Sequence, residues 1–141
     1  MVKTKTLFTE LANAVVRRKK MIEIIAMVVV CVSLASFGQI YMKKGLNEVG
    51  GIRLNELLSM KIFSTVFNPS VFLGVVLYML AAVLWLAALS MGNVSFMYPL
   101  MAIGYLLTAV LARFYFSESI TPLRWLAILA IIGGVLLLMK S

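Results

Sequence analysis

Long apolar runs separated by short polar stretches dominate the chain. Three of these runs contain no charged residue, and they extend from Ile24 to Met42, from Val71 to Met91 and from Val94 to Ala112. Each matches the roughly 20 residues that a helix needs to cross a hydrocarbon core about 30 Å thick. A fourth run, from Thr121 to Met139, contains only Arg124, whose long side chain can reach the interface from the first turn. The pattern predicts four transmembrane helices, over about residues 21–43, 70–91, 94–116 and 121–140.

Helix-boundary signals separate the predicted spans. Asn68-Pro69 and Thr121-Pro122 each place a capping side chain before a proline that fits the first helical position. Gly92-Asn93 leaves a very short connection, so the second and third spans are expected to form an antiparallel hairpin. Pro99 follows one turn into the third span, where its ring and its missing N–H predict a kink.

The long connection between the first two spans, residues 44–69, predicts a helix that lies on the membrane surface. It begins with the turn-forming residues NEVGG. Over about residues 53–67, apolar side chains then fall mostly on one side of a helix and polar side chains on the other. Such a helix is too polar to span the bilayer and suits its interface. The predicted fold is therefore all-α, an integral membrane protein with four transmembrane helices and an amphipathic interfacial helix between the first two.

Residues 1–20 form a separate N-terminal segment in this prediction, ahead of a four-helix transmembrane domain at 21–141. Apolar residues recur in the segment at helical spacing, and it ends in the basic cluster RRKK at 17–20. We favour an amphipathic helix at the interface, with a disordered basic tail as the alternative. Over the whole chain, basic residues divide almost evenly between the two sides of the membrane. The cluster therefore favours a cytoplasmic N-terminus, and dual insertion stays open.

The composition supports a membrane protein and narrows its chemistry. Hydrophobic residues make up 63% of the 141 residues, which is more apolar surface than a soluble domain of this size can bury. The net charge is +8, and the charged residues flank the apolar spans. We therefore expect contact with anionic membrane lipids and not with nucleic acid. The sequence has no histidine, one cysteine, and no nucleophile–base pair or phosphate loop. We therefore expect no metal site, no cofactor and no enzyme activity.

A polar stripe marks the C-terminal end of the first span. Ser36, Gln39 and Lys43 are spaced three and four residues apart, which places them on one helical face. Polar groups inside a bilayer are costly and usually face a protein interior or a wet cavity. The stripe is therefore either one wall of a substrate path or a set of interhelical contacts that ends in a snorkelling lysine.

Aromatic and basic residues on the second and third spans extend this candidate path. Trp85 lies deep for an interface anchor, so it either lines a cavity or packs in the core. Tyr98, Tyr105 and Arg113 share one face of the third span. Arg113 could hold a phosphate with its planar fork, anchor a headgroup, or pair with Glu118. The candidate substrate-binding residues are Ser36, Gln39, Lys43, Trp85, Tyr98, Tyr105 and Arg113.

Much of the membrane portion resembles the drug/metabolite transporter superfamily. The resemblance rests on SFGQIYMKKG at 36–45, LWLAAL at 84–89, YPL at 98–100, TPLRW at 121–125 and GGV at 133–135. Glu118 belongs to the same signature. We expect it to have a structural role and to pair with Arg113 or Arg124 in the connection after the third span.

Two four-helix branches of that superfamily differ at one position of the first span. The small multidrug resistance proteins carry a glutamate there that exchanges protons for substrate, where this chain has Ala35 or Ser36. The motif GQ-x-x-x-K at 38–43 instead resembles the flippase subunits for undecaprenyl-phosphate-linked aminoarabinose. A stripe without a carboxylate suits a substrate that brings its own negative charge, such as a lipid phosphate.

The resemblance implies a multi-pass transporter subunit of the cell inner membrane that flips a polyprenyl-phosphate-linked sugar as a dimer. A small multidrug or metabolite exporter is one alternative, and a membrane scaffold subunit without transport activity is another. Ridges of small residues on the third and fourth spans let helices approach closely and predict the dimer contact. These residues are Gly104, Thr108 and Ala112, and Ala130 and Gly134. The partner is either a second copy or a related four-helix subunit.

Overall fold

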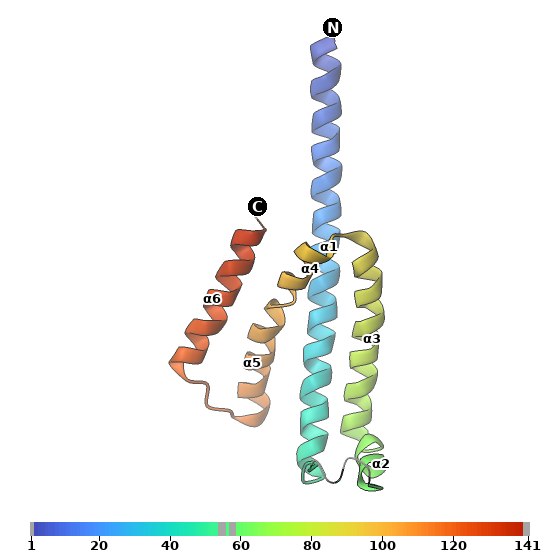
Figure 1. Cartoon of the computed structure of the whole chain (residues 1–141), viewed down its shortest axis with the longest axis vertical. Coiled ribbons are helices and arrows are strands. Elements are labelled where there is room, and N and C mark those ends of the chain that lie inside the picture. The colour runs from blue at the N-terminus through green and yellow to red at the C-terminus, as the bar shows by residue number, and fades with distance from the viewer. Residues whose placement is uncertain (1, 54–55, 57–58, 140–141) are drawn as a thin grey trace.

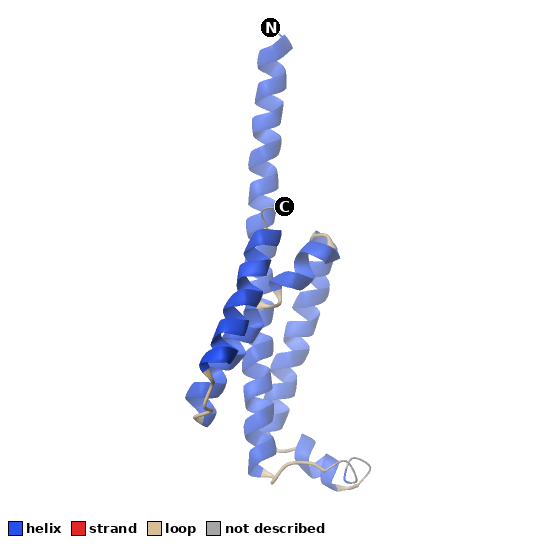
Figure 2. Ribbon diagram, turned by 60° about the vertical axis from the view of Figure 1, so that its left-hand side comes forward, coloured by secondary structure: helices blue, strands red, loops and turns tan. Residues whose placement is uncertain are grey.

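The computed structural model describes residues 2–53, 56 and 59–139, and the regular secondary structure in these ranges is helical (Figure 1, Figure 2). The all-α prediction is confirmed for this part of the chain. The helices are α1 (Val2–Glu48), α2 (Lys61–Val66), α3 (Pro69–Met91), α4 (Val94–Leu100), α5 (Ile103–Phe116) and α6 (Pro122–Leu138). In Figure 1, α1 stands between α3 and the α4–α5 pair, and α6 lies outside α5.

Three stretches of the described chain are long and apolar enough to cross a membrane. They are Glu10–Glu48, Pro69–Met91 and Val94–Phe116. Three of the four predicted spans are thus confirmed by length and composition. The fourth, predicted over 121–140, is a shorter apolar helix of 17 residues. At 1.5 Å per residue it rises about 26 Å, and its crossing of the bilayer stays a prediction.

Both predicted cap-then-proline boundaries form as the sequence indicates. The side chain of Asn68 accepts hydrogen bonds from the backbone N–H groups of Ser70 and Val71, at 2.9 and 3.3 Å. The Thr121 hydroxyl accepts one from the backbone of Arg124, at 3.3 Å. These bonds satisfy N–H groups that have no partner inside the helix. α3 and α6 therefore begin at the prolines, one residue beyond each cap.

The kink expected from Pro99 is present as an interruption of the third span. α4 ends at Leu100 and α5 begins at Ile103. Between them, the backbone N–H groups of Met101 and Ala102 donate to carbonyls three residues back, at 3.1 and 3.0 Å. Such bonds tighten the chain locally and leave the regular α-helical ladder. The third span consequently consists of two helices with separate axes.

The first span differs from the prediction at both of its ends. α1 runs without a break from Val2 to Glu48, so residues 2–20 are helical but continuous with the span. The N-terminal part projects beyond the bundle in Figure 1. At the other end α1 passes the predicted limit at residue 43, and Gly50 and Gly51 stop it with φ angles of +78° and +75°. The N–H of Gly51 bonds to the carbonyl of Leu46, at 2.8 Å, which closes a Schellman-type cap.

The surface helix predicted over 53–67 is wrong in extent. Within the described residues only Lys61–Val66 is a regular α-helix, and the predicted positions 54, 55, 57 and 58 lie outside them. Before α2 the carboxylate of Glu56 accepts hydrogen bonds from the backbone of Arg53 and from the ammonium of Lys61, at 3.0 and 2.8 Å. These bonds tie Glu56 to Arg53 before it and to Lys61 at the start of α2.

Close approach of two helix backbones defines the packing of α1 against α3. Gly38 and Gly74 face each other, and a Cβ atom added to Gly74 would lie only 2.6 Å from the Gly38 carbonyl oxygen. Real Cβ atoms do not come so near to a backbone atom, so both positions must remain without side chains. Small residues of this kind let membrane helices pack in the absence of a hydrophobic driving force.

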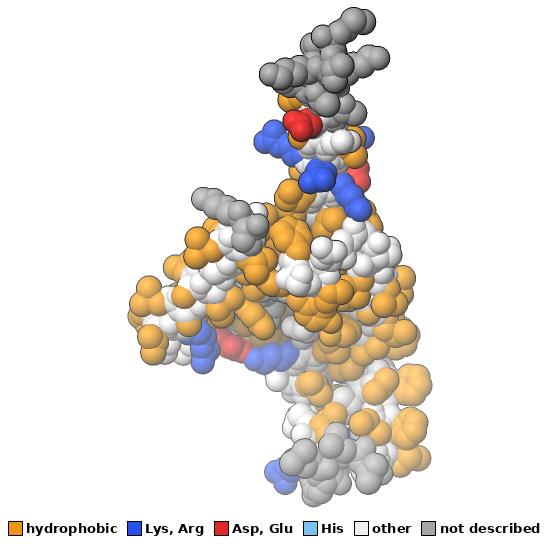
Figure 3. Space-filling model, turned by 45° about the horizontal axis from the view of Figure 1, so that its top comes forward, with side chains coloured by type: hydrophobic (Ala, Val, Ile, Leu, Met, Phe, Trp, Pro, Cys, Tyr) orange, Lys and Arg blue, Asp and Glu red, His pale blue; other side chains and the backbone are white. Residues whose placement is uncertain are grey.

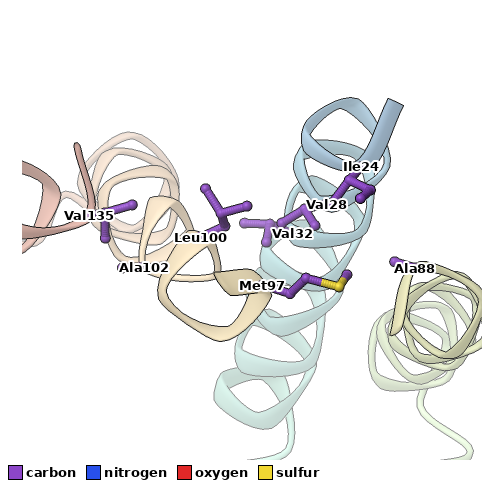
Figure 4. Close-up of a cluster of buried hydrophobic side chains, with 8 residues drawn as sticks. All are labelled: Ile24, Val28, Val32, Ala88, Met97, Leu100, Ala102 and Val135. Carbon is purple, nitrogen blue, oxygen red and sulfur yellow. The ribbon is translucent and has the colours of Figure 1, made fainter. Parts of the chain in front are cut away.

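A cluster of buried apolar side chains lies toward the end of the bundle at which α1 enters it (Figure 4). Ile24, Val28 and Val32 of α1 supply one wall of it. The others come from the four segments around α1, and they are Ala88, Met97, Leu100, Ala102 and Val135. α6 thus contributes one member, Val135, and Figure 1 shows it set apart from α1.

One predicted dimer ridge is used inside the chain. A Cβ added to Gly104 would lie 3.0 Å from a methyl group of Val32 on α1. Thr108, one turn later, donates a hydrogen bond to the Ser36 hydroxyl, at 3.1 Å. Gly104 and Thr108 therefore contact α1 within the chain, and a dimer contact through this ridge stays a prediction. A Cβ on Gly134 of α6 would meet nothing within 4 Å, so the second predicted ridge is free within the described chain.

Candidate functional site

Ser36 and Gln39 of the polar stripe on α1 line a cavity of about 380 Å³ between α1, α3, α4 and α5. Five of the seven predicted substrate-binding residues line it. They are Ser36 and Gln39 from α1, Trp85 from α3, Tyr98 from α4 and Tyr105 from α5. The sequence grouped these residues by the helical face on which each lies. The packing of the helices then brings the five side chains to one cavity.

The walls of this cavity are polar in places but carry no charge. Ser36 is buried and bonded to Thr108, so its hydroxyl is partly engaged between α1 and α5. The rings of Trp85 and Tyr98 meet edge to face, with their centroids 5.6 Å apart. Gln39 and Tyr105 are exposed, which opens the cavity on the surface of the bundle. No acidic or basic side chain appears among its lining residues in the described part of the chain.

A second cavity, of about 430 Å³, lies between α1, α5 and α6 and was not predicted. It shares Gln39, Tyr105 and Thr108 with the first cavity, so these three side chains form a wall between the two. Glu118 and Arg124 contribute charged groups to its lining. The sequence signal was TPLRW together with Glu118, which lie on either side of one connection. Arg124 was interpreted as a snorkelling side chain or a partner of Glu118, and not as part of a cavity wall.

Lys43 pairs with Glu118, and the partners predicted for that carboxylate are wrong. The Lys43 ammonium forms an ion pair with Oε1 of Glu118, and lies 4.9 Å from the ring centroid of Phe116. The side chains of Lys43 and Glu118 are 49% and 35% exposed. The pair forms because α1 packs against α5, which brings the end of α1 beside the α5–α6 connection. Lys43 therefore lines neither cavity.

Arg113 is separated from the residues with which it was grouped. It is exposed, lines neither cavity and makes no ion pair with any described residue. The grouping assumed one regular helix through Tyr98, Tyr105 and Arg113. Tyr105 and Arg113 lie on the same helix, α5, but eight residues separate them by about 80° around its axis and about 12 Å along it. Tyr98 and Tyr105 reach the same cavity from either side of the break after Leu100, whereas Arg113 lies beyond the cavity lining, in the last turn of α5.

Comparison with known proteins supplies relatives for part of the chain. The probable 4-amino-4-deoxy-L-arabinose-phosphoundecaprenol flippase subunit ArnE of Pseudomonas fluorescens strain Pf0-1 is 37% identical over 54 residues, or 38% of this chain and 47% of that protein. The subunit of the same name from Pseudomonas fluorescens strain Pf-5 is 33% identical over 61 residues, which cover 43% and 54% of the two chains. That of Yersinia pseudotuberculosis serotype O:1b is 34% identical over 59 residues, which cover 42% and 52%.

The chain is a distant, partial relative of these flippase subunits. It spans about half the length of the curated relatives it matches. The predicted resemblance is confirmed at this level. No family model matches the chain, and no solved structure matches it. The relatives are named as probable flippase subunits, and the apolar helices of this chain agree with a multi-pass membrane protein.

Proposed function

We propose that the chain is one subunit of a dimeric transporter that flips a polyprenyl-phosphate-linked sugar across the cell inner membrane. The observation that carries the proposal is the uncharged polar cavity between α1, α3, α4 and α5. Its volume of about 380 Å³ falls within the range of about 300–1,000 Å³ that is usual for small-molecule sites. The partial relationship to flippase subunits supports the same conclusion.

The cavity suits the sugar end of such a lipid. The amide of Gln39 and the hydroxyls of Tyr98 and Tyr105 offer hydrogen bonds to sugar hydroxyls. The indole of Trp85 offers a flat apolar face to a sugar ring. Because the cavity opens on the side of the bundle, the polyprenyl tail can remain in the bilayer while the headgroup enters.

The phosphate would be received at the edge of the membrane by cationic side chains. Lys43 lies one turn beyond Gln39 and already binds a carboxylate oxygen, that of Glu118. A substrate phosphate would compete with Glu118 for the same ammonium group. Arg113 is exposed one helical turn before the end of α5 and would attract the phosphate without lining the cavity.

A dimer would complete the transport path. The outer side of α6 is apolar and open, and Cβ atoms on Gly133 and Gly134 would meet nothing within 4 Å. Two four-helix units packed through α6 would enclose the lateral openings of the cavities. The named relatives are flippase subunits, so a related four-helix chain is as suitable a partner as a second copy.

A proton-coupled exporter of small cations is the second candidate. Glu118 lines the cavity between α1, α5 and α6, and a carboxylate there could exchange a proton for a cationic substrate. In the flippase proposal Glu118 instead regulates access to Lys43. The two candidates therefore differ in the charge of the substrate, which is a cation for the exporter and a lipid phosphate for the flippase.

The experiment compares both substrates in one preparation. The full chain, together with any subunit that co-purifies with it, is reconstituted into liposomes. Flipping of a fluorescent polyprenyl-phosphate sugar and proton-driven uptake of a fluorescent cation are then measured. We expect lipid flipping that Gln39→Leu reduces at least tenfold, whereas Phe37→Leu, on another face of α1, leaves it unchanged. Cation uptake that depends on Glu118, without lipid flipping, would establish the exporter instead.

A further inference from the structure

A separate pocket lies where α1 leaves the bundle, away from both substrate cavities. It encloses about 580 Å³ between α1, the α3–α4 turn and the end of α6. Arg17 and Lys20 contribute basic groups to its lining, and Asn93 and Ser95 contribute neutral polar groups. No acidic side chain lines it in the described part of the chain. The pocket therefore has the charge to receive an anion.

Two of the four residues in the basic cluster face this pocket and two face elsewhere. Arg17 and Lys20 continue the side of α1 that enters the bundle, where Ile24 is only 6% exposed. At 100° per residue, Arg18 and Lys19 project from other sides of the helix. They are absent from the pocket lining. Neither Arg17 nor Lys20 forms an ion pair with a described residue, so both charges are available to a ligand.

The depth of the pocket corresponds to the headgroup layer of the membrane. The 23 residues of α3 rise about 34 Å, which covers a hydrocarbon core about 30 Å thick. α3 ends at Met91, which is on the pocket wall. Apolar side chains, among them Met21 and Phe96, line the pocket beside the cations. Figure 3 shows basic side chains gathered on α1 above the largely apolar surface of the bundle.

We propose that this pocket binds one anionic phospholipid. Its phosphate lies between Arg17 and Lys20, where the guanidinium fork and the ammonium group supply charge-assisted hydrogen bonds. The polar side chains of Asn93 and Ser95 bond to the remaining headgroup oxygens. One acyl chain lies against Met21 and continues into the bilayer.

A lipid in this position would also hold α6 against the rest of the chain. Leu138 at the end of α6 and the following Met139 both line the pocket, together with residues of α1. Its main contacts with other helices are with α4 and α5, and Val135 is its one member of the buried cluster. The bound lipid would thus bridge α1 and the end of α6. It would be a structural ligand, distinct from any transported substrate.

Native mass spectrometry of the full chain tests the proposal. The protein is released from nanodiscs that contain equal amounts of phosphatidylglycerol and phosphatidylcholine with identical acyl chains. We expect the wild type to retain one phosphatidylglycerol in preference to phosphatidylcholine. Arg17→Gln/Lys20→Gln should weaken this retention about thirtyfold, because each cation near the membrane surface contributes about fivefold in binding.

Matched variants separate this pocket from the general attraction of a basic surface. Arg18→Gln/Lys19→Gln removes the same charge from other sides of the same helix and should keep phosphatidylglycerol at least tenfold better than the pocket variant. Ser95→Glu places a carboxylate in the pocket and should expel the lipid. Ser90→Glu, at the same end of α3 but outside the pocket lining, should not.

Three results would overturn the proposal. An equal loss of lipid in the two double variants would mean that only the overall surface charge matters. Equal retention of both lipids by the wild type would mean that the pocket has no anionic lipid site. Release of phosphatidylglycerol by millimolar inorganic phosphate, with phosphate retained in its place, would assign the pocket to a free anion. None of these outcomes depends on whether the chain transports a sugar lipid.

Discussion

Single atoms determine how closely α1 approaches its neighbours. A Cβ on Gly74 would lie 2.6 Å from the backbone nitrogen of Met42 as well as from the Gly38 carbonyl oxygen. On the α5 side, the hydroxyls of Ser36 and Thr108 meet at 3.1 Å. The backbone contact fixes one side of α1 and the hydroxyl contact fixes the other. Gln39 is thereby left at the boundary between the two cavities.

Replacing Gly74 with alanine should destabilise the α1–α3 pair. The new methyl group would press on two backbone positions that cannot rotate away, and such overpacking costs about 1–3 kcal/mol. Gly133→Ala is the control, because its methyl group would meet nothing within 4 Å, and the better helix propensity of alanine should leave the free energy of unfolding unchanged or raise it by up to about 1 kcal/mol. Reversible unfolding in mixed micelles gives both values. Equal effects of the two substitutions would contradict this account of the helix pair.

The contacts of Glu56 should make the connection before α2 sensitive to pH. The hydrogen bond from the Lys61 side chain, followed by that from the Arg53 backbone, lowers the pKa of Glu56 from its ordinary value of 4.5. Because the folded pKa is the lower one, these contacts stabilise the turn above the ordinary pKa and are lost as pH falls through the folded value. We expect Lys61→Met to raise the carboxyl ¹³C titration midpoint of Glu56. An unchanged midpoint would show that the pair does not form in solution.

Between elements, the break in the third span and the ion pair at the end of α1 decide the shape of the site. Tyr98 and Tyr105 reach one cavity from either side of the break, and Arg113 lies beyond that cavity toward the end of α5. The ion pair connects α1 to the α5–α6 connection through Lys43 and Glu118. Both partners are more than a third exposed, so the pair adds only about 0.2–1 kcal/mol to stability. Its main consequence is to occupy the Lys43 ammonium.

Removing either partner of this pair should have opposite effects on an anionic lipid. Glu118→Gln frees the Lys43 ammonium and should strengthen retention of a polyprenyl phosphate several-fold. Lys43→Met removes the cation and should weaken it by a similar factor. Lipid retention is measured by mass spectrometry on folded samples, with the double variant as the control for coupling. If both substitutions weaken retention equally, the pair supports the fold and does not compete with the phosphate.

For the whole molecule, α6 is a loosely held helix that leaves much of its surface unpartnered. Val135 joins it to the buried cluster, while its glycines at 133 and 134 have open space around them. The cavities on either side of Gln39 open laterally, so the described chain alone does not enclose a path. A second four-helix unit against α6 would cover both the helix and the openings.

Gly134→Leu should weaken dimer formation in lipid about tenfold or more, since a bulky side chain holds two backbones apart. Ala87→Leu adds comparable bulk to an exposed position of α3 and should leave the dimer intact. Energy transfer between labelled chains, followed as the protein is diluted with lipid, measures both. A wild type that stays monomeric at every lipid ratio would exclude the dimer.

The basic cluster at 17–20 should hold the N-terminus in the cytoplasm. Single cysteines at Glu10 and Met60, both exposed, are placed in a chain that carries Cys31→Ala. With an impermeant thiol reagent, we expect position 60 to react from outside the cell and position 10 to react only after lysis. Labelling of position 10 alone from outside would show the opposite orientation. Labelling of both positions from outside would establish dual insertion.

The sequence by itself determined the features that depend on residues within a turn or two of one another. Asn68 and Thr121 cap the helices they were expected to cap, and the third span breaks after Pro99. Helical periodicity also identified five of the residues that line the first cavity, because the face of a regular helix follows from spacing alone. The apolar lengths of three spans were fixed in the same way.

The tertiary structure alone decided which of these faces meet. It placed Glu118 beside Lys43 and not beside Arg113 or Arg124, because α1 packs against α5 and carries Lys43 to that connection. It also placed Gly104 and Thr108 against α1 and left Arg113 outside the cavity lining. Contacts of this kind join residues about 75 positions apart, and no local pattern encodes them. They follow from how closely the backbones pack and from where the third span loses its regular hydrogen bonds.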